Sequence, residues 1–74
     1  MQELIRLLEG IVEKEINWSK ENALFTDGLI DSIDLAEIIS ELEDTYDIEI
    51  TMESMVPENF NSVQAMYRLI EELQ

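Results

Sequence analysis

Apolar residues recur at a spacing of three and four residues in three separate stretches of the chain. This spacing places them on one face of an α-helix, and it predicts helices over residues 2–15, over residues 32–46 and from Ser62 onward. The inward faces consist of Leu4, Ile5, Leu8, Ile11 and Val12; of Leu35, Ile38, Ile39, Leu42 and Tyr46; and of Val63, Met66, Tyr67, Ile70 and Leu73. Pro57 suits the first turn of a short helix near residues 55–60. We therefore expect an all-α fold, a small four-helix bundle of three longer helices and one short helix.

The loop between the first two helices is long for a small domain. Residues 16–31 show no sustained period, and Asp27–Gly28 is a turn signal. The loop nevertheless contains Leu24, Phe25, Leu29 and Ile30, so we expect it to be ordered and attached to the core. Ordered loops of this length are usually functional. The 74 residues give one domain, residues 1–74, with a single core.

The charge of the chain excludes several classes of function. Four basic and 18 acidic residues give a net charge of −14, which opposes binding to nucleic acid and to anionic membranes. The chain has no run of apolar residues long enough to span a bilayer. It also has no cysteine or histidine, which excludes a thiol nucleophile, a Ser–His pair, disulfides and the usual zinc sites. We expect a cytoplasmic monomer that is neither an enzyme nor a metal protein.

Ile33 lies on the outer face of the second predicted helix. A helical wheel places it opposite the core stripe. Its neighbours on that face are Glu37, Ser40 and Asp44, and the small Ala36 lies beside it. One interpretation is an apolar anchor for a partner protein within an acidic surface. The alternative is that single exposed apolar residues are common and carry no meaning.

Ser32 lies at the start of the same helix and has two interpretations. Either Asp31 or Ser32 can cap the helix. A similar cap, followed by a capping-box glutamine, is expected at the start of the last helix, over Asn61–Gln64. The second interpretation is chemical, because a phosphate attached to Ser32 would lie at the positive end of the helix. Asp31 and Asp34 oppose a phosphate by repulsion, although they could hold a divalent cation while it is attached.

The segment Leu29–Leu35 (Leu-Ile-Asp-Ser-Ile-Asp-Leu) resembles the attachment motif of acyl carrier proteins. In that family an Asp-Ser pair follows a long loop and opens the second helix. The similarity continues through Leu42–Ile50, with an acidic helix end, an aromatic residue and an Ile-x-Ile segment, and through Ser62–Gln64. It therefore covers nearly the whole chain.

The resemblance implies a function for each matching residue. Ser32 would carry 4′-phosphopantetheine, transferred from coenzyme A by a phosphopantetheinyl transferase. Basic partner enzymes, among them a loading enzyme for acyl or aminoacyl groups, would contact the second helix. The residues expected there are Asp31, Ile33, Asp34, Ala36, Glu37 and Glu41. Because a thioester carrier needs a thiol and the chain has none, the arm would supply it.

Several alternatives stay open at this point. Residues 51–60 are less similar to the family, so the cargo could be an acyl chain of fatty-acid or secondary-metabolite synthesis, D-alanine, or a peptidyl group. An acidic adaptor without a prosthetic group would use the Ile33 surface but not Ser32. A calcium-binding module is disfavoured, because the spacing of Asp27, Asp31 and Asp34 does not match the EF-hand loop.

Overall fold

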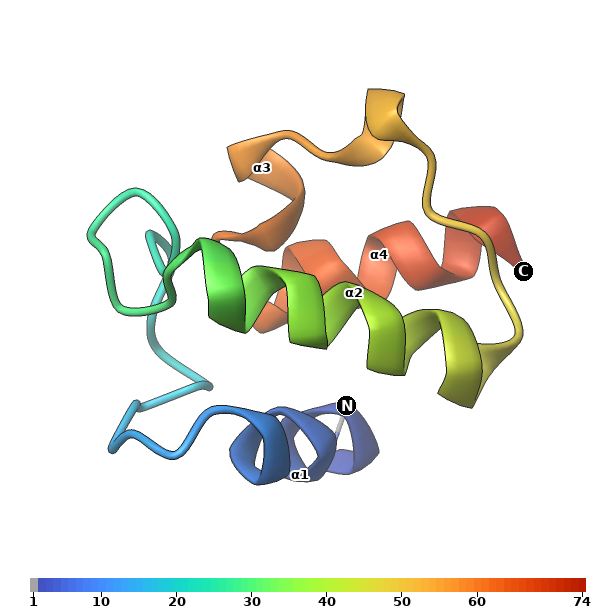
Figure 1. The fold of residues 1–74 in the computed structure, drawn as a ribbon. Helices are drawn as coiled ribbons and strands as arrows, with labels where there is room; N and C mark the ends of the chain where they lie inside the picture. The colour runs from blue at the N-terminus through green and yellow to red at the C-terminus, as the bar shows by residue number, and fades with distance from the viewer. Residues whose placement is uncertain (1) are drawn as a thin grey trace.

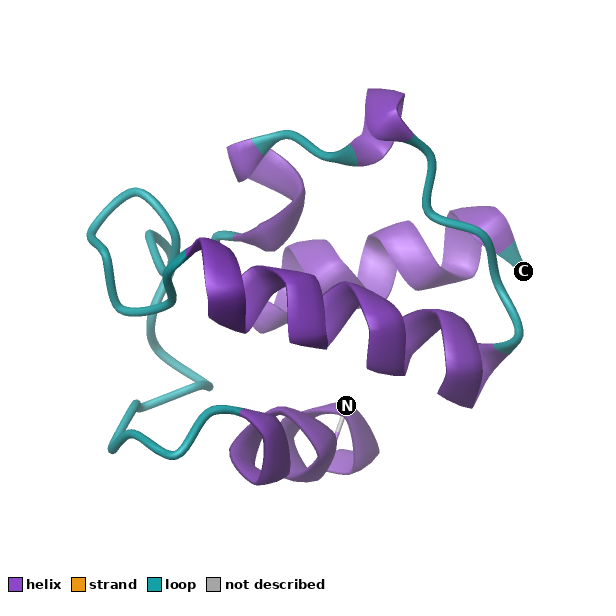
Figure 2. Ribbon diagram, in the orientation of Figure 1, coloured by secondary structure: helices purple, strands orange, loops and turns teal. Residues whose placement is uncertain are grey.

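The computed structural model describes residues 2–74 and confirms the all-α fold. It contains α1 (Gln2–Ile11), α2 (Ser32–Tyr46), the short 3₁₀ turn η1 (Met52–Ser54), α3 (Pro57–Phe60) and α4 (Val63–Leu73). The helices alternate with loops, and no strand occurs within residues 2–74 (Figure 2). The three longer helices are those that the apolar spacing predicted, and the short helix is the one that Pro57 indicated.

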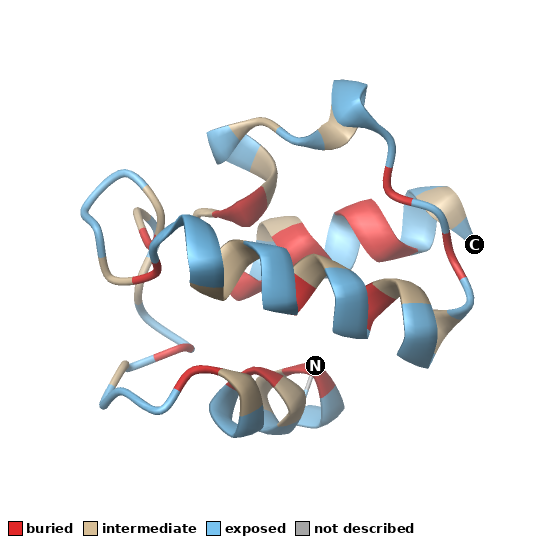
Figure 3. Ribbon diagram, viewed as in Figure 1, coloured by how far each residue is buried: buried red, intermediate tan, exposed pale blue. Residues whose placement is uncertain are grey.

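The helices surround one apolar core. In Figure 1, α2 crosses the front of the molecule, α1 lies below it and α4 lies behind it. Helix α1 contacts both α2 and α4, and α3 contacts α4. All three long helices turn buried faces inward (Figure 3). The residues that are essentially inaccessible to solvent are Leu4, Leu8, Val12, Leu24, Ile30, Ile38, Leu42, Phe60, Val63, Met66 and Ile70.

Helix α1 is shorter than the sequence predicted, because it ends at Ile11 and not at residue 15. Its last helical hydrogen bond runs from the Val12 N–H to the Leu8 carbonyl at 2.9 Å. Glycine and β-branched residues are weak helix formers, and Gly10, Ile11 and Val12 stand in succession here. The chain therefore leaves the helix before Lys14, which changes where that lysine can reach.

Helix α2 begins and ends where the sequence predicted. Ile38 and Leu42 are fully buried, whereas Leu35, Ile39 and Tyr46 are half-buried at the margins of the core. The helix ends at Asp47, which has a left-handed conformation with φ 53° and ψ 52° and donates its N–H to the Glu43 carbonyl. None of the helices described for residues 2–74 is long and apolar enough to cross a bilayer.

The segment after α2 agrees only in part with the prediction. The two isoleucines of the Ile-x-Ile segment, Ile48 and Ile50, are both buried. The turn η1 was not predicted, and α3 begins at Pro57, so Met55 lies outside it. One turn of helix is enough to place Phe60 in the core.

Helix α4 is capped near the predicted position, but its buried face differs from the predicted apolar stripe at one residue. The Ser62 hydroxyl accepts a hydrogen bond from the Ala65 N–H at 3.0 Å. The third helical position is therefore Ala65, so the predicted capping-box role of Gln64 is wrong. Tyr67 is 38% exposed, whereas Leu69 is only 4% exposed. The helix is rotated slightly toward Leu69, which the predicted stripe omitted.

Candidate functional site

The hydroxyl of Ser32 is exposed at the first residue of α2. Asp31 caps the helix: its Oδ1 accepts the Asp34 N–H at 2.8 Å, and Asp34 Oδ2 accepts the Asp31 N–H at 3.2 Å. This reciprocal capping box settles the choice between Asp31 and Ser32. Within residues 2–74 the Ser32 hydroxyl has no hydrogen-bond partner, and the residue is exposed. The hydroxyl is therefore free to react, beside backbone N–H groups at the positive end of the helix.

The loop that leads to Ser32 is ordered and attached to the core, as predicted. Leu24 and Ile30 are fully buried. The Leu24 carbonyl accepts the N–H groups of Leu29 and Ile30 at 2.9 and 3.0 Å. Gly28 permits this tight turn because its φ is 75°, a value that other residues rarely adopt. The turn fixes the chain two residues before Ser32.

Asn61, at the junction of α3 and α4, holds the same loop from the other side. Its Oδ1 accepts the N–H groups of Phe25 and Thr26 at 3.0 and 3.1 Å, and the Thr26 hydroxyl at 3.0 Å. Its carbonyl accepts the Leu24 N–H at 2.9 Å. The sequence associated Asn61 only with the start of the last helix, because no local pattern indicates a contact across 36 residues.

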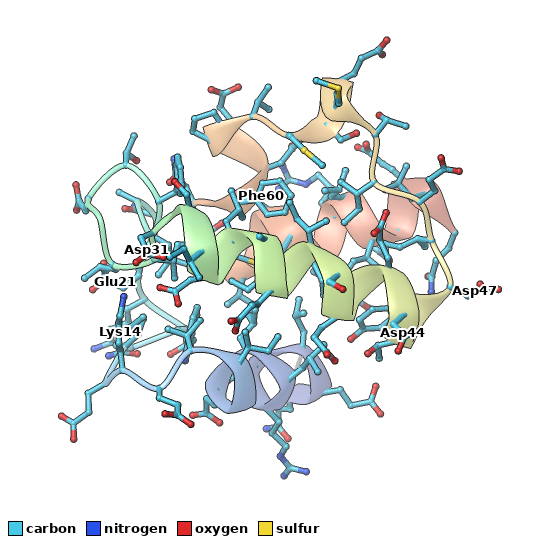
Figure 4. The ribbon with its side chains drawn as sticks, viewed as in Figure 1. Lys14, Glu21, Asp31, Asp44, Asp47 and Phe60 are labelled. Carbon is cyan, nitrogen blue, oxygen red and sulfur yellow. The ribbon has the colours of Figure 1, made fainter. Side chains whose placement is uncertain are left out.

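Lys14 joins the end of α1 to the start of α2. The sequence placed it on the solvent side of a longer helix. Instead, its Nζ donates to Asp34 Oδ2 at 2.9 Å and to the Leu29 carbonyl at 3.3 Å. The bond from Lys14 holds the pKa of Asp34 below its ordinary value, and the same bond raises the pKa of Lys14. Figure 4 shows Lys14 and Asp31 at the same end of the molecule.

The outer face of α2 presents most of the predicted partner residues to solvent. Ile33 is 71% exposed. Ala36, Glu37 and Glu41 are exposed with it, and Asp31 is exposed at the helix start. Figure 3 shows this face of α2 as a largely pale blue surface. Asp34 differs from the other five, because it is half-buried and its Oδ2 is paired with Lys14.

A groove of about 400 Å³ begins at Ser32 and follows α2. Its lining combines apolar side chains with polar ones: Ser32, Leu35, Ala36, Ile39, Ser40, Glu43 and Met55. Such a lining suits a slender group that carries both methyl and amide groups, as pantetheine does. The free hydroxyl at one end of this groove fits a covalently attached arm.

Carboxylates at the site are used in protein contacts. Asp31 Oδ1 and Asp34 Oδ2 accept the capping hydrogen bonds, and Asp34 Oδ2 also pairs with Lys14. No group of three or more acidic side chains placed to hold a metal ion is found in the described part of the chain.

Comparison with known proteins gives the family. The family model described as "Phosphopantetheine attachment site" matches residues 1–70, so the chain belongs to the family of phosphopantetheine-bearing carrier domains. D-alanyl carrier proteins of Streptococcus pyogenes serotypes M5 (strain Manfredo), M49 (strain NZ131) and M1 are each 28% identical over 71 residues. These matches cover 96% of this chain and 90% of each relative. No solved structure matches the chain.

The family membership confirms the resemblance that the Asp31–Ser32 motif indicated. The protein is a carrier whose prosthetic group is phosphopantetheine. An acidic adaptor without a prosthetic group is thereby disfavoured.

Proposed function

We propose that the Ser32 hydroxyl is the attachment point of the phosphopantetheine arm. The observation that supports this most directly is the division of roles at the start of α2: Asp31 caps the helix, and the exposed Ser32 hydroxyl has no partner within residues 2–74. The hydroxyl oxygen forms a bond to phosphorus while the pyrophosphate bond of coenzyme A breaks. Adenosine 3′,5′-bisphosphate leaves, and the serine proton passes to the transferase or to water.

The protein's own residues then support the arm without taking part in the chemistry of the cargo. The N-terminal N–H groups of α2 favour the phosphodiester, and the groove that ends at Glu43 and Met55 offers a surface along which the arm can lie. The arm contributes the thiol that forms the thioester. We assign no catalytic residue, and separate enzymes load and unload the cargo.

The cargo that the comparisons favour is a small aminoacyl group, with D-alanine as the first candidate. The relatives that match over nearly their whole length are named D-alanyl carrier proteins. An acyl or peptidyl group is the alternative that the sequence left open.

The partners are a phosphopantetheinyl transferase, a loading enzyme and downstream enzymes with basic surfaces. The exposed acidic face of α2, with Ile33 and Ala36 among Glu37 and Glu41, attracts such surfaces by charge and offers an apolar contact. We propose that the protein acts as a monomer in the cytoplasm, where coenzyme A is available.

The attachment is tested by intact-mass measurement. Wild-type protein is incubated with a phosphopantetheinyl transferase, coenzyme A and Mg²⁺, beside a known carrier as a positive control. We expect a gain of one phosphopantetheine in the wild type, and none in Ser32→Ala. Ser40→Ala is the matched control, because Ser40 is an exposed serine in the same groove, and it should be modified normally. Modification of Ser32→Ala, or none of the wild type, contradicts the proposal.

The cargo is tested on the modified protein. A D-alanine-activating ligase with ATP and D-alanine should add one alanyl group, which hydroxylamine releases as expected for a thioester. A matched reaction with an acyl-activating enzyme and a fatty acid shows whether long acyl chains are accepted. Efficient loading of the fatty acid and none of D-alanine would favour the alternative.

A further inference from the structure

Lys14 makes the single ion pair found within residues 2–74. The chain has only four basic residues against 18 acidic ones. One of the four, Lys14, is bonded to Asp34 in the first turn of α2, although it comes from the loop that follows α1. This position depends on the early end of α1 at Ile11, because Lys14 in a continued helix would have pointed to solvent.

A phosphodiester on Ser32 would enter an already negative environment. Asp31 precedes Ser32, Asp34 follows two residues later, and neither aspartate can be moved away without opening the capping box. The N–H of Asp34 is taken by Asp31 Oδ1, so it is not available to a phosphate. Without a nearby cation, the positive helix end alone would have to offset two carboxylates and one phosphate.

The ammonium of Lys14 offsets part of this charge. It contacts Asp34 Oδ2 at 2.9 Å, and this same oxygen accepts the Asp31 N–H at 3.2 Å. It also contacts the Leu29 carbonyl at 3.3 Å, so it ties the approach to Ser32 to the helix itself. The pairing is half-exposed on the lysine side and largely covered on the aspartate side, with 47% and 18% of the two side chains accessible.

We propose that Lys14 is a positioning residue that acts as the internal counter-ion of the attachment site, allowing α2 to carry a phosphodiester on Ser32 without loss of its N-terminal cap. The proposal rests on the proposed attachment at Ser32. It goes beyond that attachment by assigning a role to a residue outside the motif, 18 positions before Ser32 in the sequence.

The test compares the melting temperatures of the unmodified and the modified protein. For Lys14→Gln we expect modification to lower the melting temperature by about 2–5 °C more than it does in the wild type, the size expected for one charge interaction at a helix end. Lys14→Arg should restore the wild-type difference. The additional decrease in the melting temperature of modified Lys14→Gln should become smaller in 1 M NaCl, because salt screens charges near the surface.

Two further variants distinguish this role from a purely structural one. Lys20→Gln makes the same change of charge at an exposed lysine whose side chain has no bonding partner in the described chain. Modification should change the melting temperature of Lys20→Gln by the same amount as it does in the wild type. In Asp34→Asn, modification should lower the melting temperature by less than it does in the wild type, because the variant removes a negative charge beside the phosphate and frees Lys14.

Each outcome either supports or overturns the proposal. If Lys14→Gln lowers the melting temperature equally in the unmodified and the modified protein, Lys14 serves folding only and the proposal is overturned. The proposal is also overturned if Lys20→Gln increases the loss of melting temperature on modification as much as Lys14→Gln does. Both results leave attachment at Ser32 intact, because the mass gain of the wild type measures attachment independently. A wild-type protein that gains no mass overturns both proposals together.

Discussion

The side-chain oxygen of Asn61 accepts a hydrogen bond from the backbone N–H of Phe25 at 3.0 Å, across 36 residues of chain. The same oxygen accepts two further bonds from Thr26. A single amide group at the junction of α3 and α4 thereby fixes the loop that delivers Ser32. The geometry of the proposed attachment site thus depends on the far end of the sequence as well as on its own motif.

Replacing Asn61 should therefore loosen the loop. Asn61→Ala leaves the partly buried Phe25 N–H and the two Thr26 donors without their acceptor, and we expect a loss of about 1–3 kcal/mol of unfolding free energy. The amides of Phe25 and Thr26 should exchange their hydrogens faster, which hydrogen-exchange NMR measures. Asn61→Asp retains an acceptor oxygen and should retain most of the protection. The exposed Asn22→Ala is the control, and equal exchange in all variants would contradict the role of Asn61.

The Lys14–Asp34 pair should give a stability contribution confined to a window of pH. The pKa of Asp34 is lowered in the folded protein, chiefly by the hydrogen bond from Lys14. The contribution is thus complete above the ordinary carboxyl value of 3.8 and is lost as the pH falls through the lower folded value. The pKa of Lys14 is raised, so the contribution is complete below 10.5 and is lost as the pH rises through the higher folded value.

The measurement is the difference in melting temperature between the wild type and Asp34→Asn. We expect a constant difference between pH 5 and 8 that shrinks at both extremes. Repulsion among the other carboxylates changes with pH in both proteins alike and cancels from the difference. A difference that persists unchanged below about pH 2 would show that the pair contributes nothing through its charge.

Ile33 should matter for partner enzymes and not for folding. Because 71% of Ile33 is exposed, Ile33→Asp should change the unfolding free energy by less than about 0.5 kcal/mol. Loading by the partner enzyme should slow by about 5- to 30-fold, the effect of losing one central apolar contact. Met52→Asp introduces the same charge at a residue that is 85% exposed on η1, and its loading rate should be unchanged. Equal rates for the two variants would remove Ile33 from the partner surface.

Asp47→Gly should stabilise the protein. Asp47 is the only residue other than glycine with a positive φ within residues 2–74, and an L side chain is unfavourable in that conformation. Glycine at this helix end should raise the unfolding free energy by about 0.5–1 kcal/mol. Asp47→Ala removes the same charge but keeps a side chain, so it should be less stable than Asp47→Gly. Denaturant unfolding, followed by the fluorescence of the buried Trp18, compares the three proteins.

The features that the sequence predicted well are those that depend on local spacing. The bounds of α2, the order of the helices and the burial of Leu24 and Ile30 follow from apolar periodicity and from turn residues. The exposure of Ile33 follows from the same helical wheel. The family of the protein was predicted from the motif around Ser32 together with the acidic charge, the size and the helix order, and the family model confirms it.

The features that the sequence missed depend on contacts between distant segments. The early end of α1 releases Lys14 to meet Asp34, a pairing that no helical pattern indicates. Asn61 was read as part of a local cap, whereas its side chain contacts a loop more than thirty residues away. In α4, the exchange of Tyr67 for Leu69 on the inward side reflects a small rotation that is set by packing against the other helices.

The capping box formed by Asp31 and Asp34 has a consequence for the life history of the protein. Since these two aspartates cap α2 without the Ser32 hydroxyl, a group attached to that hydroxyl has no capping hydrogen bond to break. With the arm attached at Ser32 as proposed, the start of α2 keeps the same two capping bonds before and after it is loaded.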